Sequence, residues 1–555
     1  MQKYFSFVLL CFIYNSSVFA QTNITAKTVV KIKIIEGDTK HITPAMVCIT
    51  KSGSNQVHLP PLGEVEKDVS NLDAFFKGVE FDTAKNWVGP VRMTNGRGNN
   101  KDRSGIYGVT PSIPYWKAPV MYQTSGDFSI ELPIGVWKIN IEHGNEYLPI
   151  DEEIIIKKSN TTLTKTFVLK RWINMPDLGW YSGDVHVHHP TNKPGFREYL
   201  LEMAKSEDLH LVNILEMGDH AGVTFKQQGF GQKFRVNKGK YWLVSGQEDP
   251  RSRFGHISGL NIDRMVRDTT VYDYYDIVLR SLKMQPGAVV GFAHFSWFPL
   301  NDQNAKSGFP WLITTGQIDY VELLQFSLLN DLDYYDYLNL GFRIVAAAGS
   351  DFPWGSTIGE VRTMVYSGNN FTPNKWFSAL KAGHTFVTNG PALFLTADGK
   401  LPGTEIFKSS GSSIKIAVKA LSRSKIGTIK RVAIYNNKGL VSEALNVYNK
   451  DSIVINLDHK LKYSQWISAV VICENGAVAH TTPVYVVVDG KPTYDIDKGP
   501  EIIEKQIQSI QVLNKKDSAV TPVDHGLIER YNTAIKFYQI LLSEMTKDKQ
   551  ERDNK

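Results

Sequence analysis

Apolar and polar residues alternate along the early part of the chain, up to a change of pattern at about residue 173. Val30, Ile32 and Ile34 alternate with lysines, which is the period of a strand with one buried face. The same alternation recurs over residues 126–141, where glycine and proline provide turns. Short alternating strands with such turns predict a small β-sandwich over residues 21–172.

The alternating pattern over residues 126–141 loosely resembles the carboxypeptidase-regulatory or transthyretin-like sandwich modules of secreted proteins. Residues 57–122 interrupt the pattern, because they are rich in proline, glycine and aromatic residues and show no regular period. We therefore expect a long insertion there. It forms either a wall of a substrate cleft or a surface loop packed by its own aromatic side chains, and the second interpretation is favoured.

From residue 173 to residue 392, apolar strand-like runs alternate with amphipathic helices, which is typical of an α/β fold. Residues 196–207 place Tyr199, Leu200 and Met203 on one face of a helix. Further helices are expected over residues 271–283, 331–341 and 375–382.

Metal-binding residue types stand where the predicted strands of this region end. His186 and His188 are two residues apart on one strand, so their imidazoles project from the same face. His256 begins the strand that follows the Glu248 loop. In a (β/α) barrel the carboxyl ends of the strands converge on one face, so a metal site is predicted there. The residues at successive strand ends are His186, His188, His220, Glu248, His294 and Asp351.

The order of these motifs resembles a known superfamily. Gly183-Asp184-Val185-His186-Val187-His188 and the later Gly218-Asp219-His220, Gly246 to Glu248, Gly255-His256, Ala293-His294 and Gly349-Ser350-Asp351 are similar to the successive motifs of the polymerase-and-histidinol-phosphatase (PHP) superfamily. The run from residue 380 to residue 391 is similar to the CehA/McbA-type metallohydrolases. The resemblance covers about residues 176–410 and implies a distorted seven-stranded (β/α) barrel that holds two or three divalent metals.

The resemblance also implies a ligand set. The first metal would be held by His186, His188, Glu248 and Asp351, and Glu248 would bridge to a second metal held by His256 and His294. The third ion of the superfamily uses the histidine that matches His220. It also uses an acidic residue after the His-x-His and a histidine after the final aspartate. This chain has neither of the last two, because Phe352 and Pro353 follow Asp351 and no acidic residue occurs between Pro190 and Phe196. We therefore expect two ions, and nitrogen and oxygen ligands suit Zn, Mn or Fe.

Two metals that share a carboxylate activate a bound water near neutral pH, which predicts hydrolysis of a phosphoester or of an amide, ester or carbamate. His220 and His384 are candidates for proton transfer to the leaving group. The alternative is that both are hydrogen-bonded rim residues, and the position of His384 is commonly arginine in this branch. Arg251, with Arg253, is a candidate clamp for an anionic substrate, the alternative being a solvated loop charge.

The pattern after residue 392 returns to alternating strands, which predicts a second β-sandwich over residues 393–492. Residues 493–555 are expected to form a helical tail docked on the body, because apolar residues recur at helical spacing. Cys48 and Cys473 lie in apolar runs and are expected to be buried free thiols. Histidines outside the barrel, such as His143 and His480, are expected at the surface.

The N-terminus indicates export. Residues 1–20 combine a short positive region, an apolar run and a small-residue cleavage site, as in a secretory signal peptide. We expect a periplasmic or extracellular protein without stable membrane insertion. The net charge of +6 over 555 residues does not call for nucleic acid as a partner, so a small-molecule or glycan-linked substrate is expected. Two alternatives remain for the barrel: mainly structural metals, or a degenerate metal-binding barrel that acts as a glycan- or surface-binding module.

Overall fold

The computed structural model describes most of the chain from residue 27 onward. The described residues are 27–54, 121–192, 195–218, 222–249, 254–268, 270, 272–296, 308–353 and 357–554, together with the backbone of 57–59, 63–65, 88–92 and 110–111. The predicted signal peptide, His220 and Arg251 lie outside the described residues. None of the described helices combines the length and the apolar character that a membrane span needs.

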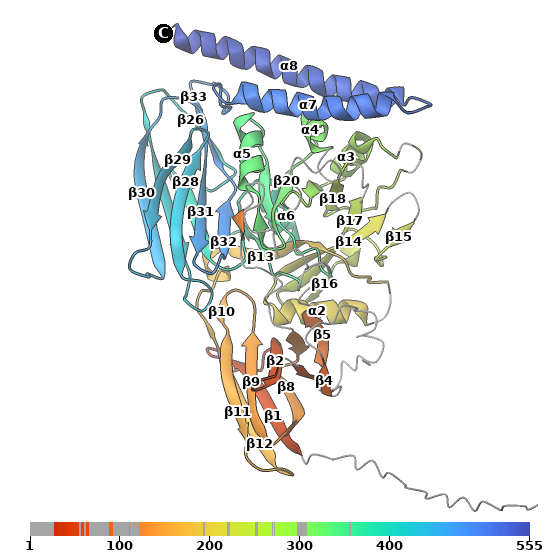
Figure 1. Ribbon diagram of the computed structural model, residues 1–555, viewed down its shortest axis with the longest axis vertical. Coiled ribbons are helices and arrows are strands. Elements are labelled where there is room, and N and C mark those ends of the chain that lie inside the picture. The colour runs from red at the N-terminus through yellow and green to blue at the C-terminus, as the bar shows by residue number, and fades with distance from the viewer. Residues whose placement is uncertain are drawn as a thin grey trace, which may run out of the picture.

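The N-terminal part consists of two facing sheets, at the bottom of Figure 1. One sheet has the order β10-β12-β1-β8, with β10 Tyr147–Leu148, β12 Thr162–Arg171, β1 Lys27–Glu36 and β8 Asp127–Pro133. The other has the order β11-β9-β2, with β11 Ile150–Ile156, β9 Gly135–Glu142 and β2 Ala45–Lys51, and β7 Met121–Thr124 also pairs with β2. Val30, Ile32 and Ile34 are fully buried, which confirms the predicted alternation in β1.

The stretch predicted as an insertion contains strands that its irregular pattern did not predict. These are β3 Val57–Leu59, β4 Gly63–Val65, β5 Val88–Arg92 and β6 Thr110–Pro111. A strand of two to five residues is too short to show a period of two, so these strands could not be predicted from the sequence pattern. β6 pairs with β21 (Leu328–Leu329) of the central region, so this stretch reaches across to the α/β part of the chain.

The central region joins strands that run in sequence order from β13 to β22. β13–β14, β14–β17, β19–β20 and β20–β22 are parallel pairs, whereas β18 is antiparallel to both β17 and β19. After β22, Asp351 N donates to His186 O (2.8 Å) and His188 N donates to Phe352 O (2.7 Å), so this segment lies beside β13. The bounds are β13 Trp180–Val187, β14 Leu211–Gly218, β17 Tyr241–Asp249, β18 His256–Leu260, β19 Val289–Ala293, β20 Tyr320–Gln325 and β22 Val345–Ala348.

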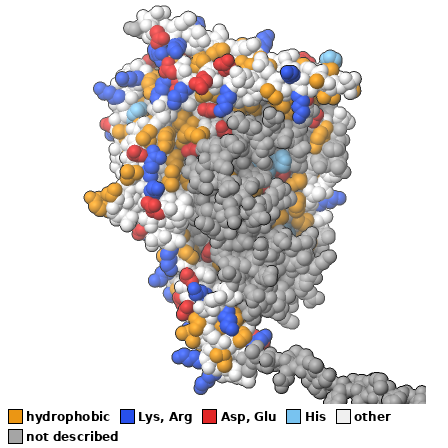
Figure 2. Space-filling view, in the orientation of Figure 1, with side chains coloured by type: hydrophobic (Ala, Val, Ile, Leu, Met, Phe, Trp, Pro, Cys, Tyr) orange, Lys and Arg blue, Asp and Glu red, His pale blue; other side chains and the backbone are white. Residues whose placement is uncertain are grey.

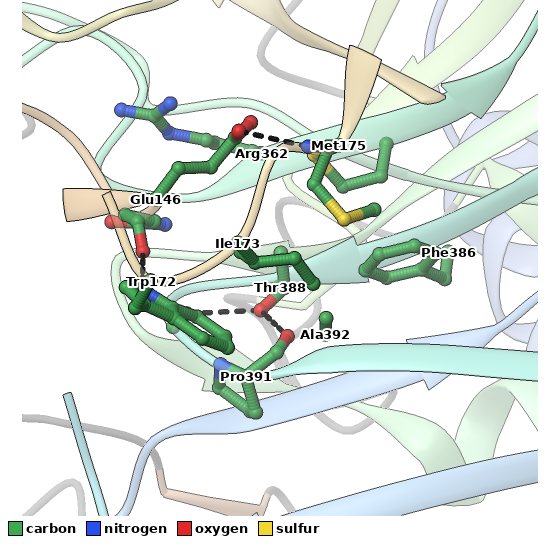
Figure 3. Close-up of a pocket in the computed structure, with 12 residues that line it drawn as sticks. Glu146, Trp172, Ile173, Met175, Arg362, Phe386, Thr388, Pro391 and Ala392 are labelled. Carbon is green, nitrogen blue, oxygen red and sulfur yellow. Dashed lines mark hydrogen bonds between the residues drawn. The ribbon is translucent and has the colours of Figure 1, made fainter. Parts of the chain in front are cut away.

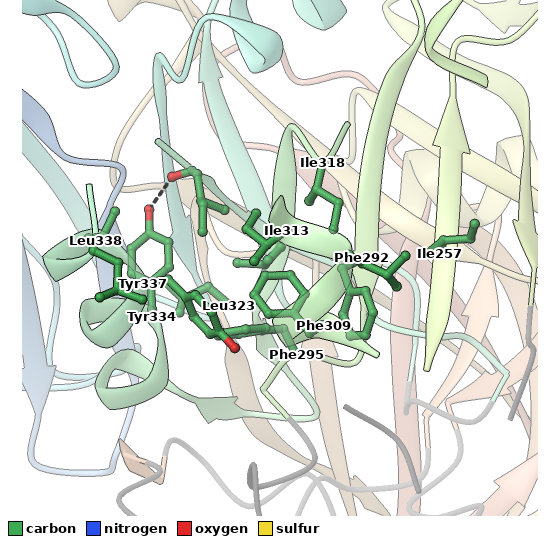
Figure 4. Packing of buried hydrophobic residues seen from close by; sticks show 14 of the residues in the cluster. Ile257, Phe292, Phe295, Phe309, Ile313, Ile318, Leu323, Tyr334, Tyr337 and Leu338 are labelled. Carbon is green, nitrogen blue, oxygen red and sulfur yellow. Dashed lines mark hydrogen bonds between the residues drawn. The ribbon is translucent and has the colours of Figure 1, made fainter. Parts of the chain in front are cut away.

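Helices cover these strands where the periodicity predicted them. The helices are α2 Phe196–Ser206, α3 Tyr275–Lys283, α5 Asp331–Asn339 and α6 Pro373–Lys381, and a short α4 spans Phe309–Leu312. The core behind them is aromatic: the rings of Phe292 and Phe309 are 4.8 Å apart and those of Phe309 and Tyr337 are 4.7 Å apart, both edge to face (Figure 4). This packing fixes β19 and β20, which carry part of the site described below.

The C-terminal sandwich is continuous with the central region. β24 Thr385–Thr388 pairs with β23 Arg362–Tyr366 on one side and with β32 on the other. The remaining strands are β25 Ala392–Ala397, β26 Glu405–Lys408, β27 Ser413–Leu421, β28 Ile429–Asn436, β29 Gly439–Leu445, β30 Ser452–Lys460, β31 Gln465–Cys473, β32 Val478–Thr481 and β33 Val484–Val488. Cys48 and Cys473 are free and buried, as predicted.

The tail is a pair of helices, α7 Gly499–Ser518 and α8 His525–Asp553, which lie across the top of the molecule in Figure 1. Tyr531 and Tyr538 of α8 are fully buried, and the Tyr538 hydroxyl donates to Pro310 O at 2.7 Å. The helical tail therefore docks on the body, as the spacing of its apolar residues predicted. Its outer surface carries charges of both signs (Figure 2).

A buried ionic network joins the N-terminal sandwich to the central region. Arg171 donates to Glu146 at 2.5 Å and to Asp208 at 2.7 Å, although these groups are nearly inaccessible to solvent. Beside the network, Glu146 lines a cavity of about 20 Å³ together with Trp172 and Arg362, and its carboxylate also accepts from Met175 N at 3.0 Å (Figure 3). A cavity of this size holds about one water molecule.

Two histidines that were expected at the surface are buried, so that expectation is wrong. His143 is 1% exposed and lies against Ser206 O at 3.1 Å, in the seam between the N-terminal sandwich and α2. His480 is fully buried, and its Nε2 lies 2.8 Å from the Tyr335 hydroxyl. Both histidines are buried by segments that are distant in sequence. A local sequence pattern does not reveal such burial.

Glu146 should make stability depend on pH. Burial, reinforced by Asp208 and opposed by Arg171, raises the pKa of Glu146 to about 7. Since the folded chain then binds this proton more tightly than the unfolded chain does, stability is lost as pH rises from about 4.5 to 7. We expect Glu146→Gln to remove up to about 3 kcal/mol of this pH dependence. Urea unfolding of both proteins at pH 5 and pH 8 measures it, and parallel profiles would contradict the role of Glu146.

Candidate metal centre

The two histidines of β13 face each other in a way that calls for a cation. His186 and His188 are buried, and their Nε2 atoms are 2.9 Å apart. The Nδ1 atom of His188 lies 3.0 Å from Leu215 O, which can only accept, so this nitrogen carries the proton. The Nδ1 atom of His186 likewise lies 2.7 Å from a carboxylate oxygen of Glu322. In the neutral rings, both Nε2 lone pairs therefore point at the same place.

Glu248, at the end of β17, lies between two groups of histidines. Its Oε2 is 3.0 Å from Nε2 of His188, and its Oε1 is 3.4 Å from Nε2 of His186. A neutral His188 with its proton on Nδ1 cannot donate a hydrogen bond to Oε2. Oε2 has no hydrogen-bond partner among the described residues although it is buried. A buried carboxylate oxygen that meets only nitrogen lone pairs is what a metal ligand presents before the ion is added.

His256 and His294 make the second group. His294 Nε2 lies 3.0 Å from Nδ1 of His256 and 3.3 Å from Oε1 of Glu248. Gln325 donates its amide to Glu322 at 3.0 Å, so its Oε1 is an acceptor and takes the Nδ1 proton of His294 at 2.9 Å. In the neutral ring, Nε2 of His294 is therefore left with a lone pair that faces Glu248.

The position of His256 follows from the topology. β18 returns antiparallel along β17 without an intervening helix, and Glu248 is opposite Ser258 in the register. The first residue of β18 therefore lies beside the last residues of β17. This explains why a histidine that begins a strand joins ligands that end strands.

Asp351 completes the set from the segment after β22. Its Oδ1 is 3.4 Å from Nε2 of His186 and 3.6 Å from Nε2 of His188. Asp351 and His294 both have left-handed backbone angles, with φ of 54° and 58°. Such angles in non-glycine residues cost energy and are concentrated at functional sites, which fits two side chains that are turned toward one point.

The separations suit a metal ion. Ligands of a tetrahedral ion with bonds of about 2.1 Å lie roughly 3.4 Å apart, and the separations observed here range from 2.8 to 3.6 Å. Two overlapping groups of three satisfy the spacing, one of His186, His188 and Asp351 and the other of His186, Glu248 and His294. All donors are nitrogen or carboxylate oxygen, so the residues present fit Zn, Mn or Fe.

Charge in the cluster also favours cations. Burial alone would lower the pKa of His186, but the carboxylates of Glu322, Glu248 and Asp351 outweigh it and raise that pKa well above its ordinary value. Burial would raise the pKa of Glu248, yet the neighbouring histidines hold it well below its ordinary range. The carboxylates around the cluster therefore favour a positive charge at this point, which a divalent ion would supply.

Sequence reasoning missed the residue that supports this cluster. Glu322 is fully buried in β20; its Oε1 faces His186, and its Oε2 accepts from the backbone of His294 at 2.9 Å and from Gln325. The signal was present in the sequence as one acidic residue within an otherwise apolar strand, Tyr320–Gln325. Asp184 also supports the cluster. Its carboxylate accepts hydrogen bonds from the backbone N–H groups of His186, Ser350 and Gly359 at 2.8 to 3.0 Å.

Three further predicted residues are not brought to the cluster by the described structure. His220 and Arg251 lie outside the described residues. His384 is described, and its ring lies 2.8 Å from Pro402 O. Its backbone oxygen accepts from Tyr366, which is opposite Trp180 at the beginning of β13. Six strand residues, about 20 Å, separate that end of β13 from His186. His384 therefore lies too far from the cluster to transfer a proton there.

Replacing Glu322 with glutamine should weaken metal binding 10- to 100-fold, the usual effect of losing a partner that orients a ligand. The His186 ring, the His294 backbone N–H and the Gln325 amide all donate to Glu322. The NH2 group of a glutamine would face at least one of these donors and could not accept from it. Competition with a chromogenic chelator measures the affinity. The control is Glu198→Gln, which removes one negative charge from an exposed position on α2. Equal affinities in the two variants would contradict the role of Glu322.

Comparisons with known proteins leave the family of this chain open. No known family model matches the sequence, and no curated protein is similar to it. Among solved structures, the chain is similar to the fibronectin(III)-like modules of Clostridium thermocellum CbhA, with 18% identity, coverage of 18% of this chain and 97% of that chain, and a TM-score of 0.14. A TM-score of this size carries no argument about fold or function.

Proposed function

We propose that this chain is an exported metal-dependent hydrolase of the PHP superfamily, similar to the CehA/McbA-type enzymes, with its site on a distorted (β/α)7 barrel. The observation that carries the proposal is the convergence of the Nε2 atoms of His186, His188 and His294 on the carboxylate of Glu248. The ordered sequence motifs supply the family resemblance, and their described metal-binding residues lie together in one cluster.

The side chains divide between two ion positions that share Glu248. His186, His188 and Asp351 would hold one ion, and His256 and His294 would hold the other. When bound, two divalent ions activate water near neutral pH and polarise the bond that is attacked, which suits a phosphoester or an amide, ester or carbamate.

The protein's own groups fix the ligands in the required state. Leu215 O holds the Nδ1 proton of His188, and Gln325 holds that of His294, so both rings present Nε2 to the site. His256 is the most open ligand, with 29% of its side chain exposed, whereas the others are at most 9% exposed. Solvent and substrate therefore reach the described part of the site from the His256 side.

The proposal is tested with the chain from residue 21 onward, loaded separately with Zn, Mn and Fe. Each form is offered a phosphomonoester, a phosphodiester, an aryl ester, an anilide and an aryl carbamate. We expect hydrolysis in at least one class, lost on treatment with a chelator and restored by the same metal. A protein that binds metal and leaves every class intact would contradict the hydrolase and favour the binding-module alternative.

A further inference from the structure

A second pocket lies far along the chain from the metal cluster, between the C-terminal sandwich and α8. Its described lining comes from the turn between β28 and β29, residues 462–464, residues 488–497 and the end of α8, and its volume is about 560 Å³. Pockets of about 300–1,000 Å³ are the usual size for small-molecule sites. No residue of the metal cluster lines it.

The pocket presents a buried acceptor without a donor. Asn437 lines it and is only 1% exposed, which is unusual for a residue in a turn. The Nδ2 atom of Asn437 donates to the carbonyls of Ser464 (3.1 Å) and Thr493 (3.4 Å), so the orientation of the amide is fixed. Its Oδ1 then accepts no hydrogen bond from any described residue. A buried amide oxygen of this kind calls for a donor from elsewhere.

A buried carboxylate beside the pocket also has an acceptor atom without a donor. Asp495 is fully buried, and its Oδ1 accepts from Lys438 at 2.5 Å and from the backbone of Asp497 at 2.9 Å. Its Oδ2 has no hydrogen-bond partner within the part of the chain that the structure describes. Residues on both sides of Asp495 line the pocket. Asp495 does not line the pocket itself, so Asn437 offers the pocket its unpaired acceptor, and Asp495 adds a second unpaired acceptor beside it. An unpaired acceptor favours a ligand with hydroxyl or ammonium donors.

The balance of charge around the pocket argues for a neutral ligand. Lys491 contacts Asp548 at 2.8 Å and Glu551 at 3.0 Å, and Arg552 contacts Asp497 at 3.0 Å. The described lining carries four basic and four acidic side chains, so neither sign is in excess. An ammonium ligand would meet the basic groups and a phosphate or carboxylate would meet the acidic ones, whereas hydroxyl groups bond to both.

The rim offers an aromatic face. Tyr463 lines the pocket and is 40% exposed, although Lys438 Nζ lies 5.5 Å from its ring centroid. An exposed ring next to hydroxyl-binding groups provides a flat apolar surface for the C–H face of a sugar. We propose that this pocket is a binding site for a neutral carbohydrate, separate from the metal centre and independent of the proposed hydrolase activity.

The test is binding of the full mature chain to a glycan array that contains neutral, acidic and amino sugars, followed by titration in solution with the neutral oligosaccharide that binds best. Tyr463→Ala should weaken binding about tenfold or more, while Tyr463→Phe should keep it. Tyr448→Ala is the matched control, because Tyr448 is 79% exposed, also has a lysine near its ring (5.6 Å), and does not line the pocket.

Binding should be unchanged by chelator and by His188→Ala, which separates this site from the metal centre. No neutral glycan bound by the wild-type chain, binding confined to acidic or amino glycans, or equal losses in the Tyr463→Ala and Tyr448→Ala variants would each overturn the proposal.

Discussion

His188→Ala abolishes turnover and lowers the metal content of the chain without unfolding it: this is the largest effect that we expect on activity. The variant removes one of the proposed ligands to the first ion and leaves the Oε2 atom of Glu248 without its nearest nitrogen, at 3.0 Å. Loss of an ion that stabilises charge by several kcal/mol reduces the rate at least about a thousandfold. The rate is measured by steady-state hydrolysis of the substrate class that the wild-type chain cleaves, and circular dichroism checks that the variant is folded.

The matched control is His41→Ala, which removes an exposed imidazole in the N-terminal sandwich. It should leave both rate and metal content unchanged. Full activity in a folded His188→Ala protein would show that hydrolysis does not depend on this cluster.

Asp208→Ala should cause the largest loss of stability, about 3–5 kcal/mol of the free energy of unfolding. Asp208 is fully buried and accepts from Arg171 at 2.7 Å, from Lys240 at 2.8 Å and from the hydroxyl of Tyr241 at 2.8 Å. Alanine leaves the buried guanidinium of Arg171 with one carboxylate instead of two. Urea unfolding at pH 7 measures the change.

The effect should also depend on pH. Burial alone would raise the pKa of Asp208, but Lys240 and Arg171 hold it well below its ordinary value. Its contribution is therefore present above about pH 4 and is lost as the pH falls toward the folded-state pKa. Asp151→Ala, an exposed change on β11, is the control and should cost less than about 0.5 kcal/mol. A similar small cost for Asp208→Ala would mean that the seam is not held by this network.

Local patterns were sufficient for most of the longer elements and for the residue types that meet in the cluster. A period of two predicted β1, and helical spacing predicted α2, α5, α6 and the tail. Residue type at strand ends singled out His186, His188, His294 and Asp351, which lie around Glu248 together with His256 from the beginning of β18. These features depend on neighbours within a few residues, which the sequence displays directly.

Features that depend on contacts between distant segments were not predictable. Glu322 supports His186 from 136 residues away, and nothing local marks it except its charge within an apolar strand. His384 has the right chemistry but lies near the wrong end of β13, because the direction of β23 and β24 decides its place. The seam around Arg171 likewise arises only when the sandwich packs on the central strands.

We propose that this chain binds two divalent ions, held by His186, His188, Glu248, His256, His294 and Asp351. The most direct test is elemental mass spectrometry of the purified mature chain, first without added metal and then after incubation with Zn, Mn or Fe. About two ions per chain, falling to one or none in His188→Ala, is the predicted result. No bound ion, even after incubation with each metal, would contradict the metal centre and the hydrolase proposed from it.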